Sequence, residues 1–302
     1  MLPPAGPAAE LLRSENGLAA IGRAVRSVGE FLRSSRYGAI GLGILAVYAV
    51  IALFGSFLTP YSPTQIFGGH ALAPPGPIFK FGTDQNGMDI LSRTIAAARV
   101  DMGVATASEA ISVVLGVGLG LLTGFRRGWI DLVILRAMDV LQAFPVLVLA
   151  IAIVAATQQS ISTAIFVIAF VDIPVYTRLI RGEVLLIRES TYIMAAIAVG
   201  NPLPRLLARH VLPNAVPPVV TQVAIRYAYA IKLIAALAFV GVGIHVPTPE
   251  WGSMIRTGTP SIISGLWWPT VFPGVAVGVL ILGLNLLADG LQQYWDPKSH
   301  RD

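Results

Sequence analysis

The feature that most constrains this chain is Gly38–Leu58, a run without a single charged residue that ends just before Pro60. A helix of about 20 apolar residues is long enough to cross the hydrocarbon core of a bilayer, so this run predicts a membrane-spanning helix. Five further stretches predict spans, although each contains at least one charged residue. These stretches are Met102–Gly124, Ala137–Ala156, Ile161–Thr177, Ala215–Val242 and Val271–Leu291. The sequence therefore predicts an all-α integral membrane protein with six transmembrane helices.

The composition excludes most other classes of protein. Hydrophobic residues make up 55% of the chain and charged residues only 12%, whereas a soluble domain has about 25% charged residues. A soluble fold could not cover its surface with so few charges, but a bilayer accepts apolar side chains on the protein exterior. The chain has no cysteine, which excludes disulfides, thiolate metal sites and a cysteine nucleophile.

The positions of Lys and Arg predict the orientation. Of the 21 basic residues, 15 fall in segments 1–37, 125–136, 178–213 and 292–302, and only four fall in 59–101, 157–160 and 243–270. Basic residues concentrate on the cytoplasmic side of membrane proteins, so both termini are expected in the cytoplasm. The basic segment 1–37 has no apolar core typical of a signal peptide, and we expect it on the cytoplasmic membrane surface. Because the basic residues lie between spans instead of forming one stripe, lipid is expected as a partner and nucleic acid is not.

The outer segments also carry expectations. Residues 60–81 are rich in Pro and Gly and are expected to be ordered only by packing on their neighbours. We expect Trp251, Trp267 and Trp268 in the aromatic belt at the membrane interface; the alternative is that they line an entrance for substrate.

The most informative segment is 178–213, which is predicted to stay in the cytoplasm and is long for a connector. Residues 178 to 199 have the pattern of one helix, in which Ala195 and Ala196 give a smooth face. The turn Gly200–Pro204 ends that helix, and Arg205–Pro213 leads into the fifth span. The expected structure is a helix–turn–helix outside the bilayer that another protein can approach closely.

The order Ala195–Ala196, Gly200, His210, Pro213, Asn214 resembles the cytoplasmic "EAA" loop of bacterial ABC importer permeases. Further motifs are similar to those of the C-type dipeptide/oligopeptide permeases (DppC/OppC-like). They are Phe81–Arg93, Ala98–Val100, Arg178–Val184, Pro249–Gly252 and Asn285–Leu291. The chain departs from the family pattern at Met194, where the family usually has an acidic residue. It departs again at Met88, in place of an arginine, and in the turn Gly200–Asn201–Pro202.

This resemblance implies the type I ABC importer permease fold over residues 38–297, followed by a tail at 298–302. It implies a subunit in a bacterial inner membrane that forms half of a translocation path for di- or oligopeptides. The expected partners are a B-type permease, cytoplasmic ABC ATPase subunits and an extracytoplasmic peptide-binding protein. The chain lacks the G-x-x-x-x-G-K-[ST] phosphate loop, so ATP and Mg would be bound by the ATPases and this subunit would not be an enzyme. The residues expected to contact an ATPase are Tyr192, Met194, Ala195, Ala196, Gly200, Arg205, His210, Pro213 and Asn214.

Charged residues within the predicted spans are candidates for function, because a charge in the bilayer costs about 3 kcal/mol or more. Asp139 and Asp289 lie near cytoplasmic ends, where headgroups, water or loop arginines can satisfy them. Arg226 and Lys232 could pair with Glu109 or Asp172, snorkel to the interface, or face the partner subunit. A sharper hypothesis is that these residues line the translocation path and attract peptide carboxylates.

Three alternatives remain open at this point. The same kind of permease could carry another cargo, such as a nickel chelate, haem or glutathione. A secondary transporter could use Glu109 or Asp172 as a proton relay, although the long cytoplasmic segment argues against it. A membrane enzyme is the weakest alternative, because the four histidines show no metal-ligand spacing or Ser-His-Asp arrangement. His210 is therefore expected to brace its loop.

Overall fold

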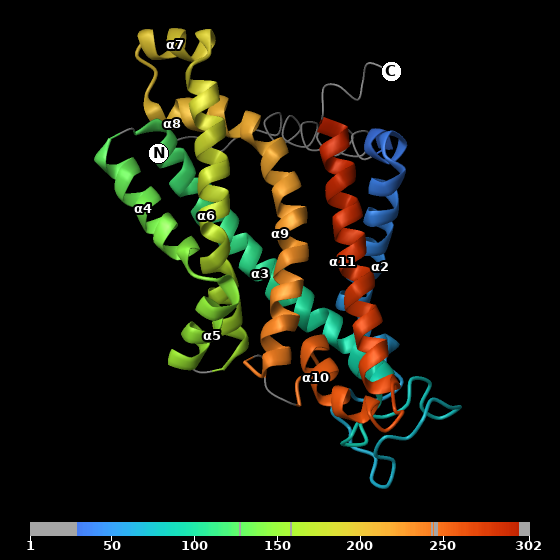
Figure 1. The fold of residues 1–302 in the computed structure, drawn as a ribbon. Coiled ribbons are helices and arrows are strands. Elements are labelled where there is room, and N and C mark those ends of the chain that lie inside the picture. The colour runs from blue at the N-terminus through green and yellow to red at the C-terminus, as the bar shows by residue number, and fades with distance from the viewer. Residues whose placement is uncertain (1–28, 127, 158, 243, 245–246, 296–302) are drawn as a thin grey trace, which may run out of the picture.

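The computed structural model describes residues 29–126, 128–157, 159–242, 244 and 247–295. The described part is helical apart from loops and two isolated β-bridges, and Figure 1 shows its long helices running between the two ends of the molecule. The elements are α2 (Arg36–Leu58), α3 (Ile90–Phe125), α4 (Trp129–Ala143), α5 (Val146–Ala156), α6 (Ile161–Arg188), α7 (Thr191–Ala198), α8 (Leu203–Leu206), a π-helix (Leu207–Val211), α9 (Leu212–Val240), α10 (Trp251–Ile262) and α11 (Trp268–Trp295). The prediction of an all-α membrane protein is confirmed.

Five of these helices are long and apolar enough to span a membrane, and the pair α4 and α5 makes a sixth span if it counts as one. The span predicted over 137–156 is broken, because α4 and α5 meet at 92°. Phe144 and Pro145 at the break have extended backbones. Proline has no backbone N–H and disfavours a helical residue before it, which explains why the helix ends there.

Helices α3 and α6 extend furthest beyond the spans that hydropathy predicted. Helix α3 begins at Ile90 instead of Met102, and the carboxylate of Asp89 caps it by accepting the N–H of Ser92 at 2.8 Å. Helix α6 continues past Thr177 to Arg188. In both cases charged residues end the apolar run, while the helix itself continues.

Glycines bring α3 and α6 together. A Cβ atom added at Gly116, Gly120 or Gly124 would lie 2.5–2.7 Å from side-chain atoms of α6, which is closer than real atoms approach. These glycines are spaced four residues apart and share one face of α3, as small residues do in close helix pairs in membranes. The spacing is visible in the sequence and could have predicted this contact.

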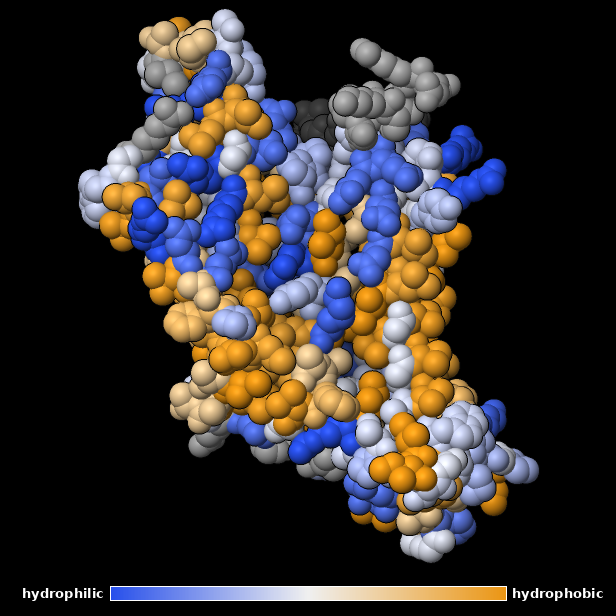
Figure 2. Space-filling view, viewed as in Figure 1, coloured by the Kyte–Doolittle hydropathy of each residue, from blue (hydrophilic) through white to orange (hydrophobic). Residues whose placement is uncertain are grey.

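Helices α2 and α11 form a second close pair, in which a Cβ atom at Gly290 would lie 2.3 Å from the Cα atom of Gly38. The Ser35 hydroxyl, just before α2, donates to the Gln293 side chain at 3.0 Å. The start of α2 and the end of α11 therefore lie side by side, at the same end of the molecule as α7 (Figure 1). Figure 2 shows hydrophilic side chains gathered towards this end and apolar ones along the sides of α5 and α11.

The opposite end contains α10 and the loop between α2 and α3 (Figure 1). This loop is packed, as predicted: the rings of Tyr61, Phe67 and Phe79 lie 5.0–5.7 Å apart. The expectation that packing alone orders it is wrong, because backbone hydrogen bonds also hold it, such as that from the Thr83 N–H to the Ala73 carbonyl at 3.0 Å. The expectation of an interfacial belt is wrong for Trp251 and Trp268, which are buried and donate from Nε1 to the backbone oxygens of Thr94 and Thr83. Trp267 is exposed.

Candidate functional site: the coupling loop and the charged cluster

The coupling loop, residues 178–213, differs from the predicted helix–turn–helix. Its first helix is not continuous to Val199, because α6 ends at Arg188 and α7 begins at Thr191. Ser190 closes the turn between them, since both its N–H and its hydroxyl donate to the Ile187 carbonyl, at 3.0 and 2.5 Å. Helix α7 is therefore a separate element that projects beyond the ends of the long helices (Figure 1).

The predicted turn at Gly200 is confirmed. Gly200 has φ +79°, a left-handed conformation that strongly favours glycine, and the Asn201 N–H donates to the Ala196 carbonyl at 3.1 Å. The turn is shorter than predicted, because a helix resumes at Leu203. The exit segment is also helical: it passes through the π-helix Leu207–Val211 directly into α9. The backbone of His210 belongs to that π-helix, but its side chain lies outside the described part.

The coupling loop exposes several large side chains on its outer surface. Tyr192 and Met194 are about half exposed, and Val199 at the tip is 78% exposed. Ala195 faces outward, but Ala196 is half-buried, so the two alanines do not form one smooth face as predicted. The other predicted contact residues for which a side chain is described, Arg205, Pro213 and Asn214, are also exposed.

Beneath this surface is a small apolar core. Ile193 of α7 is fully buried with Ile180 of α6 and Leu206 of α8, and Val211 and Ala215 at the α9 end complete the cluster. Val117, Leu121 and Phe125 from the end of α3 pack against it. Helix α7 therefore shares one packed core with α3, α6 and α9.

Ion pairs join α4 to α6 near the same end. Arg181 donates from Nε and Nη2 to the two carboxylate oxygens of Asp131, both at 2.8 Å, which is the bidentate geometry that makes such pairs strong. Arg178 forms an ion pair with Asp139 at 2.7 Å and also binds Gln142. The expectation that Asp139 meets a loop arginine is confirmed. The pair Arg181–Asp131 was missed, because residues 50 apart give no local signal.

The charged cluster lies where α3, α6 and α9 meet in the middle of the spans. The Asp172 carboxylate of α6 is buried and forms an ion pair with Arg226 of α9. The Tyr176 hydroxyl donates to Glu109 of α3 at 2.7 Å. The Arg226 guanidinium also lies 4.1 Å from the ring centre of Tyr229. The predicted pairing of Arg226 with an intramembrane carboxylate is thus confirmed, and three spans are joined through polar groups.

Lys232 is not part of this cluster. Its side chain is exposed, and its ammonium lies 6.0 Å from the ring of Tyr229. Arg226 and Tyr229 line a cavity of about 310 Å³ bounded by α4, α5, α6 and α9. Glu109 and Asp172 are buried among the helices, so of the four residues expected on a path only Arg226 and Lys232 reach a cavity or the surface.

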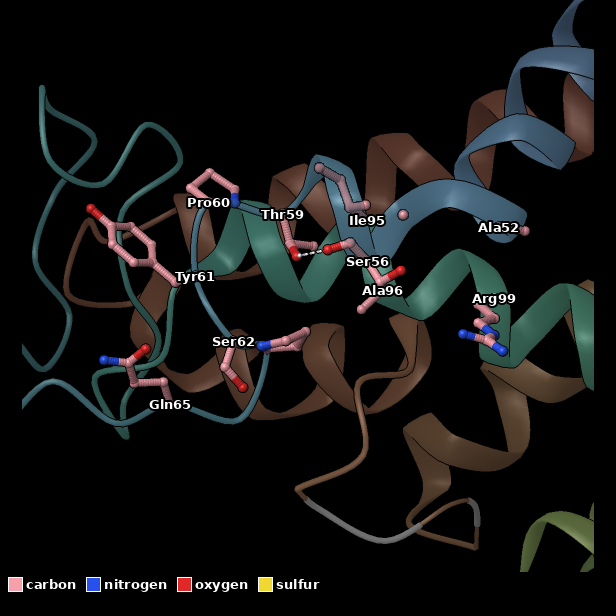
Figure 3. Close-up of a pocket in the computed structure, with 12 residues that line it drawn as sticks. Ala52, Ser56, Thr59, Pro60, Tyr61, Ser62, Gln65, Ile95, Ala96 and Arg99 are labelled. Carbon is pink, nitrogen blue, oxygen red and sulfur yellow. Dashed lines mark hydrogen bonds between the residues drawn. The ribbon is translucent and has the colours of Figure 1, made fainter.

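A second cavity, of about 480 Å³, lies at the end opposite α7, between the end of α2 and the first turns of α3 (Figure 3). Its wall combines small and polar residues, among them Gly55, Ser56 and Thr59 of α2 and the exposed Arg99 of α3. Within the described residues no ion pair or hydrogen bond of the Arg99 side chain is found.

Together, the spans, the projecting α7 and the polar cluster between the helices define a multi-pass membrane protein of the transport class. The chain belongs to the family of binding-protein-dependent transport system inner membrane components, whose family model matches residues 116–301. A model of the N-terminal transmembrane domain of oligopeptide transport permease C matches residues 27–75. The chain is therefore an ABC transport permease subunit with the type I fold, located in the bacterial inner membrane.

Curated relatives cover most of the chain. It is 36% identical over 267 residues to the dipeptide transport system permease protein DppC of Alkalihalophilus pseudofirmus, covering 88% of each chain. It is 37% identical over 269 residues to the di/tripeptide transport system permease protein DppC of Pseudomonas aeruginosa, covering 86% of this chain and 88% of the relative. The glutathione transport system permease protein GsiD of Pectobacterium atrosepticum is 35% identical over 269 residues, with 89% of each covered.

Proposed function

We propose that this chain forms half of the translocation path of an ABC importer for dipeptides and oligopeptides. The cargo follows from the relatives, which are named as dipeptide and di/tripeptide permeases. The other half of the path would come from a B-type permease, and an extracytoplasmic binding protein would deliver the peptide. ATP and Mg would be bound by ATPase subunits, which carry out hydrolysis.

The observation that carries this proposal is α7, a projecting helix with exposed apolar side chains above a packed core. We place this end in the cytoplasm, because most of the basic residues lie on its side of the spans. The ATPase would then bind the exposed surface formed by Tyr192, Met194 and Val199. Movement of α7 would be transmitted through Ile193 to α3, α6 and α9, so that the spans switch as packed units.

Binding to the ATPase is tested by co-purification with two coupling-loop variants. Met194→Asp places a charge on the exposed surface without touching the core beneath it, and Gly200→Asp alters the left-handed turn. We expect both variants to lose the ATPase. Ile263→Asp is the matched control, because Ile263 is 93% exposed at the opposite end and should leave binding unchanged. An ATPase that stays bound to both coupling-loop variants would refute the proposed contact.

For the path, we propose that the face of α9 with Arg226 and Lys232 lines it. Because Arg226 is paired with Asp172 and Lys232 is exposed, Lys232 is the cation available to a peptide carboxylate. We expect Lys232→Gln to slow uptake of peptides with a free C-terminal carboxylate several-fold, but not uptake of the same peptides as amides. Equal slowing of both would indicate that Lys232 does not meet the carboxylate.

A further inference from the structure

Two carboxyl groups meet at the start of α10. The first three backbone N–H groups of α10 each donate to one of them: Trp251 to Oδ2 of Asp101 at 3.2 Å, and Gly252 and Ser253 to the two oxygens of Glu250, both at 2.7 Å. Asp101 comes from α3, whereas Glu250 directly precedes α10. These two residues are called the carboxyl pair below.

The carboxyl pair is buried without a counter-charge. Asp101 is 2% exposed and Glu250 is 0% exposed. Within the described residues, Oδ1 of Asp101 has no hydrogen-bond partner, and neither carboxyl group forms an ion pair. A helix N-terminus carries about half a positive elementary charge, so it cannot balance two ionised carboxyl groups at this position.

The titratable and charged groups on the surrounding elements do not supply the missing charge. Tyr227 of α9 donates its hydroxyl to the Met102 carbonyl, and Tyr48 of α2 donates to the Ala276 carbonyl of α11. Arg93 is engaged with Asp84 at 3.6 Å and with the carbonyls of residues 63 and 247. Arg256, on α10 itself, is exposed with its guanidinium close to Gly241. Glu109, further along α3, is another carboxyl group and is bound by Tyr176.

A proton is the ligand that fits this site. Two carboxyl groups buried at one helix N-terminus without a counter-charge do not ionise together, so the pair keeps one proton. A metal ion does not fit, because N–H donors already point at three of the four carboxyl oxygen atoms and leave only Oδ1 of Asp101 to bind it. Burial raises the pKa of Glu250 to about 7, against the opposing effect of its hydrogen bonds from Ser253 and Gly252.

We propose that the carboxyl pair, Asp101 and Glu250, binds one proton, and that this proton holds α10 against α3. The Trp251 indole, which donates to the Thr94 carbonyl at 3.0 Å, is the other polar contact at this point. With the proton bound, one negative charge remains and the N-terminus of α10 stabilises it. Once the proton is lost, the second charge repels the first, and the contact between α10 and α3 weakens.

The direction of the pH effect follows from the raised pKa. Glu250 binds its proton more tightly in the folded protein than in an unfolded chain, so the proton contributes stability at acidic pH. This contribution is lost as the pH rises through about 7. The proposal adds a proton-controlled contact at the end opposite α7 and does not depend on the cargo.

Because the chain has no cysteine, a single introduced thiol reports on this contact. Thr94→Cys places the thiol at a buried position whose backbone binds Trp251, and Ile263→Cys gives a fully exposed reference. The complete transporter in membranes is labelled with a maleimide between about pH 6 and pH 8. We expect the labelling rate at 94 relative to 263 to rise about tenfold, as expected for a group titrating over one to two pH units.

Two variants identify the groups responsible. Asp101→Asn removes a charge but keeps an oxygen for the Trp251 N–H, and Glu250→Gln does the same for the cap of α10. In both variants we expect the ratio of the labelling rate at residue 94 to that at residue 263 to stay constant with pH. Asp139→Asn is a surface control, and with it the ratio should still rise with pH. The proposal would be overturned if the ratio of labelling rates stayed constant with pH while Asp101 and Glu250 are both present. It would also be overturned if the ratio still rose with pH in both variants. The pH dependence of labelling without Asp101→Asn or Glu250→Gln can be measured even if neither variant folds.

Discussion

Asp172 and Arg226 show how charged residues are accommodated inside this bundle of spans. The carboxylate is fully buried and the guanidinium mostly buried, and the cation also lies over the ring of Tyr229. Burial of either charge without the other is costly, because an unpaired ion in a region of low polarity loses its hydration. Removing one partner of the pair is therefore expected to lower the stability of the protein strongly, whereas removing both should lower it less.

Asp172→Asn should lower the stability of the purified chain by about 3–5 kcal/mol, because Arg226 then remains charged without its partner. Adding Arg226→Gln should recover at least half of this loss. The thermal midpoint in detergent measures both effects. Asp139→Asn is the control, since Asp139 is half exposed and such pairs contribute about 1 kcal/mol or less. Equal midpoints for Asp172→Asn and this control would contradict the account.

Sequence reasoning found the charged residues of the spans but not all of their partners. It named Asp172 and Arg226 as a pair among several possibilities, because charges in a membrane must be satisfied. It could not predict that Arg181 binds Asp131, nor that Asp101 and Glu250 meet, because these contacts depend on how distant helices pack. The indole N–H groups of Trp251 and Trp268 find backbone acceptors inside the protein, which interfacial statistics do not foresee.

At the scale of elements, the most extensive helix contact is between α3 and α6. Its glycine face lets the backbone of α3 lie directly against α6. Gly120 lies against Ile180 and the carbonyl of Thr177. Membrane helices associate through such close packing, because lipid provides no hydrophobic force between them. This contact also connects the coupling loop to the body of the protein, since α6 leads directly into it.

Gly120→Ala should destabilise the chain by about 1–3 kcal/mol, because the new Cβ atom would lie 2.7 Å from Ile180 and from the Thr177 carbonyl. Gly118→Ala is a matched control two residues away, where no described heavy atom lies within 4 Å of the added carbon. Alanine favours helix over glycine, so the control should be neutral or slightly stabilising. Thermal unfolding midpoints in detergent compare Gly120→Ala with Gly118→Ala. Identical midpoints would mean that the packing of α3 on α6 does not depend on their close contact at Gly120.

Helix positions were easier to predict than helix ends. Apolar runs located every span, because the bilayer imposes their minimum length. The ends of α3 and α6 were missed, since Arg93, Asp101, Arg181 and Arg188 continue their helices while binding protein groups. Pro145 was visible in the sequence, but a bend of 92° was not, because its size depends on what α4 and α5 pack against.

At the scale of the whole molecule, the two ends of the helix bundle are built from different elements. The coupling loop, the start of α2 and the end of α11 share one end, whereas α10 and the loop before α3 form the other (Figure 1). From the bias of basic residues we propose that the first end lies in the cytoplasm.

Single thiols test this orientation, because the chain has no cysteine of its own. In intact cells, a membrane-impermeant maleimide should label Ile263→Cys and should not label Val199→Cys; in inside-out vesicles the pattern should reverse. Both side chains are highly exposed, so protection reflects the membrane and not burial. Labelling of Val199→Cys in intact cells would show that the orientation is inverted.

The most direct test of the account is ATP-dependent uptake of a labelled dipeptide by the complete transporter in proteoliposomes. The account predicts uptake with the unchanged chain, and its loss with Met194→Asp although the chain remains assembled with its partner permease. Ile263→Asp should transport normally. Normal ATP-driven uptake with Met194→Asp, or no dipeptide uptake by the unchanged complex, would contradict the central claim that α7 couples an ATPase to peptide transport.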